Sequence, residues 1–290
     1  MDWEKGEESQ NLEDRRRVNP RTLAIGGGIG AVLILLIGGL LGIDPQKLNQ
    51  LVGNVPGAQD KGQAEERPPT AEEERTRRFA SKILRFTEQV WEEQFRKAGK
   101  RYEPPRMVLF TAEVETGCGT APSAVGPFYC PADRTVYLDP TFFDELEKKL
   151  GGSKAEFSQA YVIAHEVGHH VQNLLGYSRL VDEKRRTLPK EEYNKWSVRL
   201  ELQADYLAGV WAHHGQEKFN FIEPGDVPSA IKSANAIGDD RLQQRAGGFN
   251  SPEKYTHGRS DQRVKWFRLG LETGDMSKLK TIFQMPYDEL

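Results

Sequence analysis

The stretch VIAHEVGHHVQ, residues 162–172, carries two histidines four residues apart with a glutamate beside the first. On a helix, positions i and i+4 lie on one face about 6 Å apart, so the rings of His165 and His169 can reach one zinc ion. Glu166 then points beside the metal, where its carboxylate can take a proton from the attacking water. These residues predict a hydrolytic zinc centre. The alternative is a helix whose histidine pair is only structural.

A catalytic zinc ion needs a third protein ligand and one open position. The downstream segment ELQAD supplies Glu201 and Asp205, again four residues apart on one helical face. We expect Glu201 to bind the metal and Asp205 to accept a hydrogen bond from a ligand histidine, which fixes its tautomer. A solvated acidic face is the alternative, but apolar residues surround both acids, and buried acids need partners.

Several elements must position these residues. Apolar periodicity and end signals predict helices at about residues 70–98, 153–175, 189–214, 230–246 and 260–273. Thr70 with Glu73 and Ser153 with Glu156 have capping-box spacing, and Gly215 is expected to stop the third helix. The β-rich segments predict strands at about 108–110 and 135–138, which form a small sheet.

An uncharged apolar segment covers residues 22–43 and would reach about 33 Å as a helix, enough to span a bilayer. A buried helix and a cleaved signal peptide are the alternatives. Arginines at 15, 16, 17 and 21 precede it, so the positive-inside rule places residues 1–21 in the cytoplasm. Residues 44–69 then form a flexible linker, and residues 70–290 form an extracytoplasmic domain on a single-pass membrane protein.

The two cysteines, Cys118 and Cys130, lie twelve residues apart in a stretch rich in glycine and proline. An oxidising compartment permits a bridge between them, so we expect a disulfide. A contribution to a metal site is the alternative, but the short Cys-x-x-Cys spacing is absent.

The charge balance limits the partners. With 40 Lys+Arg against 43 Asp+Glu, the formal charge of -3 gives no basic excess to hold a phosphate backbone. Nucleic acid is therefore not an expected partner, whereas a protein or peptide substrate and the membrane are. The sequence leaves the oligomeric state open.

Several segments resemble the glutamate-ligated zinc peptidases, or gluzincins, and more closely the bacterial family of putative neutral zinc metallopeptidases. They are GPFYCPADRTVYLD, YVIAHEVGHHVQ, ELQADYLAGVWAHH, IGDDRLQ and THGRSDQRVKWF, which span roughly residue 79 to the C-terminus. The resemblance implies His165, His169 and Glu201 as ligands of one Zn²⁺ ion and Glu166 as the base. It also implies an α+β, zincin-like domain, mostly helical with a small sheet.

THGRSDQR is also similar to a Thr-His-Pro…Arg element of membrane peptidases that act on prenylated or stress-damaged proteins. His257 and Arg263 keep the spacing of six residues, while Gly258 replaces the proline. By that similarity His257 is a catalytic candidate that donates to the oxyanion, with Arg263 orienting it or the substrate. A lone loop histidine without a catalytic role is the alternative.

The other three histidines have simpler explanations. His170 is one position away from the ligand face and should point away from the metal. His213 and His214 lie near the end of the Glu201 helix, where positive charge suits the helix dipole.

Together these features predict a membrane-anchored zinc metalloendopeptidase that hydrolyses peptide bonds outside the cytoplasm. The segment 126–139 is the candidate edge strand for an extended substrate. The alternative is a noncatalytic, membrane-tethered module that keeps the zinc fold for binding.

Overall fold

The computed structural model describes residues 1–17, 68–247 and 250–290 of the chain. Its strands are β1 (Leu12–Asp14), β2 (Arg106–Leu109), β3 (Glu113–Thr116), β4 (Gly119–Pro122), β5 (Phe128–Cys130) and β6 (Thr135–Leu138). Its helices are α3 (Ala71–Lys97), α4 (Phe142–Lys148), α5 (Glu156–Leu175), α6 (Tyr177–Thr187), α7 (Lys190–Phe219), α8 (Asp226–Ala236), α9 (Asp239–Arg245), α10 (Ser260–Thr273) and α11 (Thr281–Gln284). The predicted α+β class is confirmed.

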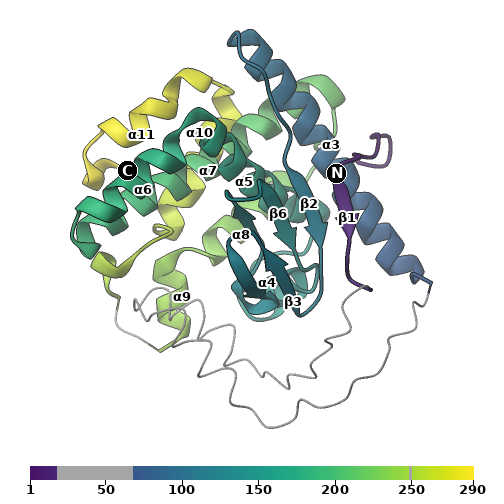
Figure 1. Cartoon of the computed structure of the whole chain (residues 1–290), viewed down its shortest axis with the longest axis horizontal. Helices are drawn as coiled ribbons and strands as arrows, with labels where there is room; N and C mark the ends of the chain where they lie inside the picture. Colours follow the sequence, from purple (N-terminus) through teal and green to yellow (C-terminus); the bar gives the residue numbers. More distant parts are fainter. Residues whose placement is uncertain (18–67, 248–249) are drawn as a thin grey trace.

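The main sheet has the strand order β1-β2-β6-β5 (Figure 1). β1, β2 and β6 run parallel, and β5 pairs antiparallel with β6. Because side chains alternate along a strand, Met107 and Leu109 face the main core. Val108 faces a smaller apolar cluster on the other side, beneath the β3–β4 hairpin.

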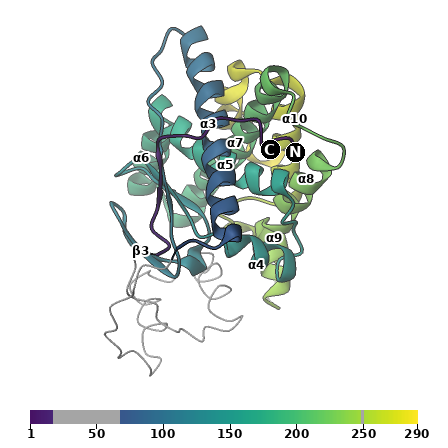
Figure 2. The ribbon, with the colours of Figure 1, turned by 90° about the vertical axis from the view of Figure 1, so that its right-hand side faces the viewer.

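The main core lies between this sheet and the helices. α3 and α5 contact each other and the sheet, α5 contacts α7, and α7 lies against α10. The predicted capping box begins α3, since Thr70 Oγ1 accepts from the Glu73 backbone N–H and Glu73 Oε2 accepts from the Thr70 N–H. Figure 2 shows the long α3 running along the face of the domain that is turned toward the viewer. The two motif-bearing helices, α5 and α7, are therefore central elements.

Two predicted helix boundaries are wrong, and the predicted helix 230–246 is two helices, α8 and α9, separated at Ile237 and Gly238. α5 begins after Ala155 without a side-chain cap, because Ser153 Oγ instead accepts from the Ala155 backbone N–H. α7 continues through Gly215, which the Phe221 ring covers closely. It ends at Asn220, whose left-handed φ of 50° stops the helix. α7 is therefore one turn longer than predicted.

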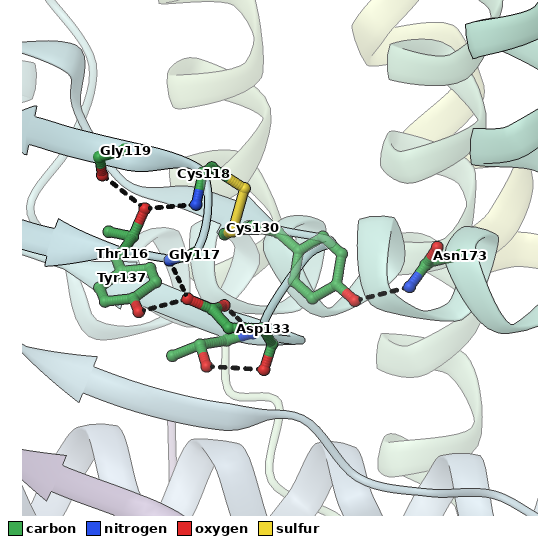
Figure 3. Close-up of a disulfide and its surroundings, with 10 residues drawn as sticks. Thr116, Gly117, Cys118, Gly119, Cys130, Asp133, Tyr137 and Asn173 are labelled. Atoms are coloured by element: carbon green, nitrogen blue, oxygen red, sulfur yellow. Dashed lines mark hydrogen bonds between the residues drawn. A yellow bond between two sulfur atoms is a disulfide. The ribbon is translucent and has the colours of Figure 1, made fainter.

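The predicted disulfide between Cys118 and Cys130 is present, and it joins the β3–β4 turn to the end of β5 (Figure 3). Asp133 holds the same region together. Its Oδ2 accepts from the Gly117 backbone N–H at 2.7 Å and from the Tyr137 hydroxyl at 2.8 Å. The β3–β4 hairpin is thus fixed to the end of β5 and to Asp133.

The N-terminal segment belongs to this same domain. β1 extends the sheet beside β2, and the Trp3 ring packs edge-on against Phe79 of α3 with centroids 5.3 Å apart. Residues before and after the predicted span therefore pack together, whereas one membrane crossing would separate them.

The structure therefore corrects the predicted location. No helix in the described part of the chain is long and apolar enough to cross a membrane. The segment 22–43 and nearly all of the predicted linker 44–69 lie outside the described residues. The predicted single-pass topology, with a cytoplasmic N-terminus and an extracytoplasmic domain, is wrong.

Candidate metal centre

The site lies where α5 and α7 cross. Gly168 of α5 allows the close approach, because a Cβ there would lie 3.1 Å from the backbone oxygen of Ala204 on α7. His165 and His169 share one face of α5, as their spacing predicts. The crossing turns that face toward Glu201 on α7.

These three side chains converge. His165 Nε2 lies 3.3 Å from Glu201 Oε2, and His169 Nε2 lies 3.4 Å from Glu201 Oε1. The potential ligand atoms of all three residues lie within 4.8 Å of one another. The sequence predicted this set, and the structure brings it together.

Each histidine has its second ring nitrogen bound elsewhere. His165 Nδ1 lies 2.9 Å from Asp205 Oδ1, and His169 Nδ1 lies 2.8 Å from Gln172 Oε1. Gln172 donates through its Nε2 to the Leu200 backbone oxygen at 2.6 Å, which turns its Oε1 toward His169. Both Nδ1 atoms therefore donate, so the Nε2 atoms that face Glu201 are the ones that can bind a metal ion. The sequence reasoning missed Gln172, which lies three residues after His169.

Asp205 is fully buried and makes four hydrogen-bond contacts. Besides His165, it accepts from the Tyr161 hydroxyl at 2.5 Å and from Arg263 Nε and Nη2 at 2.8 and 3.0 Å. Burial opposes its negative charge, but Arg263 and His165 hold the pKa of Asp205 below its usual value. Arg263 thus acts on Asp205 rather than orienting His257. Tyr161 is a further residue that the sequence reasoning missed.

The charges of the centre favour a bound cation. Burial would lower the pKa of His165, but Asp205 and Glu201 raise it to about 10. Burial would also raise the pKa of Glu201, yet His169 and His165 hold it well below its usual range. Two ring nitrogens and one carboxylate suit zinc, which can replace the protons that these groups otherwise share. The residues present therefore fit one zinc ion.

Glu166 follows His165 and lines the same cavity as the three potential ligands. Its side chain is buried, and burial raises the pKa of this carboxyl group, while His165 and His169 partly oppose that rise. A carboxylate with a raised pKa is a better proton acceptor, so Glu166 has the position and the chemistry of a general base.

His257 lies on the loop before α10 and reaches the same cavity. Asp239, fully buried, accepts through Oδ2 from the backbone N–H groups of residues 256, 257 and 258 at 2.7, 2.7 and 3.0 Å. Its Oδ1 lies 3.1 Å from His257 Nδ1. Gly258 has a φ of 91°, which proline cannot adopt, so the difference from the Thr-His-Pro pattern has a backbone cause. Asp239, which the sequence reasoning missed, fixes this histidine.

The cavity measures about 470 Å³. Its apolar wall comes from the β5 segment, α4, α5 and the α8–α9 region: Val125, Phe128, Phe142, Val162, Ile237 and Leu242. Asp182 and Arg185 of α6 line the wall with charged groups. A mixed apolar and charged cleft of this kind suits an organic ligand such as a peptide.

His170 lies on the other side of α5 and does not enter the metal centre. Its Nε2 donates to the Glu103 backbone oxygen at 2.7 Å, and its Nδ1 accepts from the Tyr129 hydroxyl at 3.0 Å. Asn173 also donates to that hydroxyl, at 3.1 Å (Figure 3). His170 therefore connects α5 to β5, as expected for a packing residue.

Comparison with known proteins shows which family the chain matches. Residues 1–282 match the model of a family described as "Putative neutral zinc metallopeptidase". The uncharacterized protein YpfJ of Escherichia coli (strain K12) is 42% identical over 290 residues, which cover 97% of this chain and 98% of that protein. The uncharacterized protein Mb2605 of Mycobacterium bovis is 46% identical over 183 residues, or 60% of this chain and 61% of that protein. No solved structure matches the chain.

Proposed function

The chain belongs to this family of putative neutral zinc metallopeptidases, and on that premise we propose that it is a zinc-dependent endopeptidase acting on proteins or peptides. One observation carries the proposal. Two histidine Nε2 atoms face one glutamate carboxylate at 3.3 and 3.4 Å, and a second, buried glutamate lines the same cavity. A zinc site with only a structural role would not need a second glutamate, such as Glu166, beside its ligands.

His165, His169 and Glu201 would hold the ion. When bound there, the ion would supply Lewis-acid chemistry, which polarises the scissile carbonyl and lowers the pKa of the attacking water. Glu166 accepts the proton of that water and then delivers it to the nitrogen of the leaving amine. With Nδ1 engaged by Asp239, the protonated His257 ring can donate from Nε2 to the carbonyl oxygen as that oxygen gains charge. Asp239 raises the pKa of His257 against the lowering effect of burial, which favours the donating form.

The substrate is proposed to bind as an extended strand along β5. In the described sheet β5 pairs only with β6, so its other edge has no strand partner. Residues 126–129 line the cavity next to the metal centre. A peptide backbone can therefore add to this edge while one of its side chains enters the apolar part of the cleft.

The experiment compares Glu166→Gln with the parent chain in zinc content and in hydrolysis of an unstructured protein. The variant keeps the size of the side chain and all three ligands but loses the base. We expect zinc content to stay at the parent value while the hydrolysis rate falls by about two to four orders of magnitude. Glu191→Gln, at an exposed position on the first turn of α7, is the control and should behave as the parent. Equal rates for Glu166→Gln and the parent would refute the mechanism and favour a noncatalytic binding role.

A further inference from the structure

A second cluster of ligand-type residues lies at the C-terminal end of α7. His213, His214 and Glu217 have potential ligand atoms within 4.8 Å of one another. His213 lies twelve residues beyond Glu201, or about 18 Å farther along the helix. The cluster is therefore separate from the candidate catalytic centre.

Both rings are fixed by backbone carbonyl groups of the neighbouring helix end. His213 Nδ1 lies 2.8 Å from the Leu271 oxygen, and His214 Nε2 lies 2.9 Å from the Gly274 oxygen. A carbonyl oxygen only accepts, so these two nitrogens must be the ones that carry hydrogen. The His213 ring also rests directly on Gly274, where a Cβ would lie 2.3 Å from its Cδ2 atom. This tight packing, together with the two hydrogen bonds, fixes the ring positions before any ligand binds.

The remaining nitrogen of each ring faces one carboxylate. His214 Nδ1 lies 3.0 Å from Glu217 Oε2, and His213 Nε2 lies 3.5 Å from Glu217 Oε1. The opposite nitrogen of each ring donates to a backbone carbonyl, so the nitrogens that face Glu217 are the ones that can act as metal ligands. The two ring centroids lie 4.9 Å apart, so both rings can reach one ion.

We infer that His213, His214 and Glu217 form a second binding site for a divalent transition metal ion such as Zn²⁺ or Ni²⁺. Two imidazoles and one carboxylate, with each imidazole hydrogen-bonded through its other nitrogen to a carbonyl group, form the arrangement that such ions select. The Glu217 side chain is 64% exposed and can adjust its position to the ion. All three ligands lie on α7, and the hydrogen bonds of the two rings hold them against the end of α10.

The test counts zinc ions in the full-length chain after metal removal and dialysis against about 10 μM free zinc. We expect about two ions per chain in the parent and about one in His213→Ala. His165→Ala/His169→Ala should also keep about one, and the triple variant none. The two sites are thus counted separately, so loss of the candidate catalytic ion cannot be mistaken for loss of this one. A parent with one ion, or a His213→Ala variant that keeps both, would overturn the inference.

A milder substitution keeps the test valid if the alanine variants do not fold. Glu217→Gln changes an exposed side chain and should weaken zinc at this site at least about tenfold without changing the fold. Glu272→Gln, at an exposed position on α10, is the matched control and should bind zinc as the parent does. Mg²⁺ should not compete, because it prefers oxygen ligands. Zinc binding that is equal in both glutamine variants, or that Mg²⁺ displaces, would also count against the site.

Discussion

Among single residues, Glu201 and Asp205 have different tasks although both belong to the same short segment of α7. Glu201 faces the two Nε2 atoms, whereas Asp205 bonds to the far side of the His165 ring. We expect Glu201→Ala to lose the zinc of this centre, because two protein ligands remain where three are needed. Asp205→Asn should keep the ligands but weaken zinc by about 10–100-fold. Zinc affinity measured for each variant distinguishes the two roles.

The control for these two variants is Asp182→Asn, which changes an aspartate of the cavity wall on α6. It should leave zinc affinity at the parent value. If Glu201→Ala held zinc as tightly as the parent, another residue would have to be the third ligand. If Asp205→Asn were indistinguishable from Asp182→Asn, the hydrogen bond to His165 would not support metal binding.

The site residues that could be predicted from the sequence are those that lie a few positions apart on the same helix. His165, His169 and Glu166 are fixed by helical spacing alone, and Asp205 follows from its distance to Glu201. Asp239 could not be found in this way, because it acts on His257 from eighteen residues away and across a loop. The bond between Arg263 and Asp205 could not be found for a similar reason, since the two residues lie 58 positions apart on different helices.

At the level of elements, His170 couples α5 to β5 and makes their contact sensitive to acid. Burial lowers the pKa of His170 to about 4. The unfolded ring takes up a proton near pH 6.5, so between these values the unfolded state binds more protons than the folded state. Stability from this residue is therefore complete above about pH 6.5 and is lost as the pH falls toward 4.

His170→Gln tests this coupling, because glutamine can donate to the Glu103 oxygen and accept from Tyr129 but does not titrate. Between pH 7 and pH 4 the free energy of unfolding of the parent should fall by about 2–4 kcal/mol more than that of the variant. Urea unfolding of chelator-treated protein at both pH values provides the comparison. Identical pH dependence in the two proteins would show that the His170 ring does not stay neutral in the folded state.

Long helices and the strands β2 and β6 could be predicted from the sequence, whereas β1 could not. α3, α5, α7 and α10 each have several turns of apolar periodicity, which tertiary contacts then reinforce. β1 has three residues, too few for an alternating pattern to be recognised, and β5 lies inside the segment 126–139 that was expected to form an edge strand. The end of α7 was misplaced because Gly215 packs against Phe221, a contact that becomes visible only in the folded chain.

At the scale of the whole molecule, the N-terminal segment completes the domain rather than standing apart from it. The Asp2 backbone N–H donates to the Phe221 oxygen at 2.8 Å, and Ser9 donates to the buried Glu88 carboxylate of α3 at 2.5 Å. β1 covers the edge of β2 that would otherwise be open. The sequence did not predict this arrangement, because the apolar segment 22–43 indicated that the residues before it are separate from the domain after it. Strand pairing over such a distance also leaves no local signal in the sequence.

If the N-terminal segment packs on the domain, Trp3→Ala should destabilise the whole protein. Trp3 is buried against Phe79, with Arg75 and Lys82 over its ring at 5.4 and 5.7 Å. Removing a buried tryptophan costs about 3–5 kcal/mol of unfolding free energy, from lost burial and the cavity that remains. Trp196→Ala, which removes a partly exposed tryptophan from α7, is the control and should cost clearly less. Urea unfolding of the full-length variants gives both values. A loss for Trp3→Ala no larger than that of the control would mean that residues 1–17 do not pack on the domain in solution.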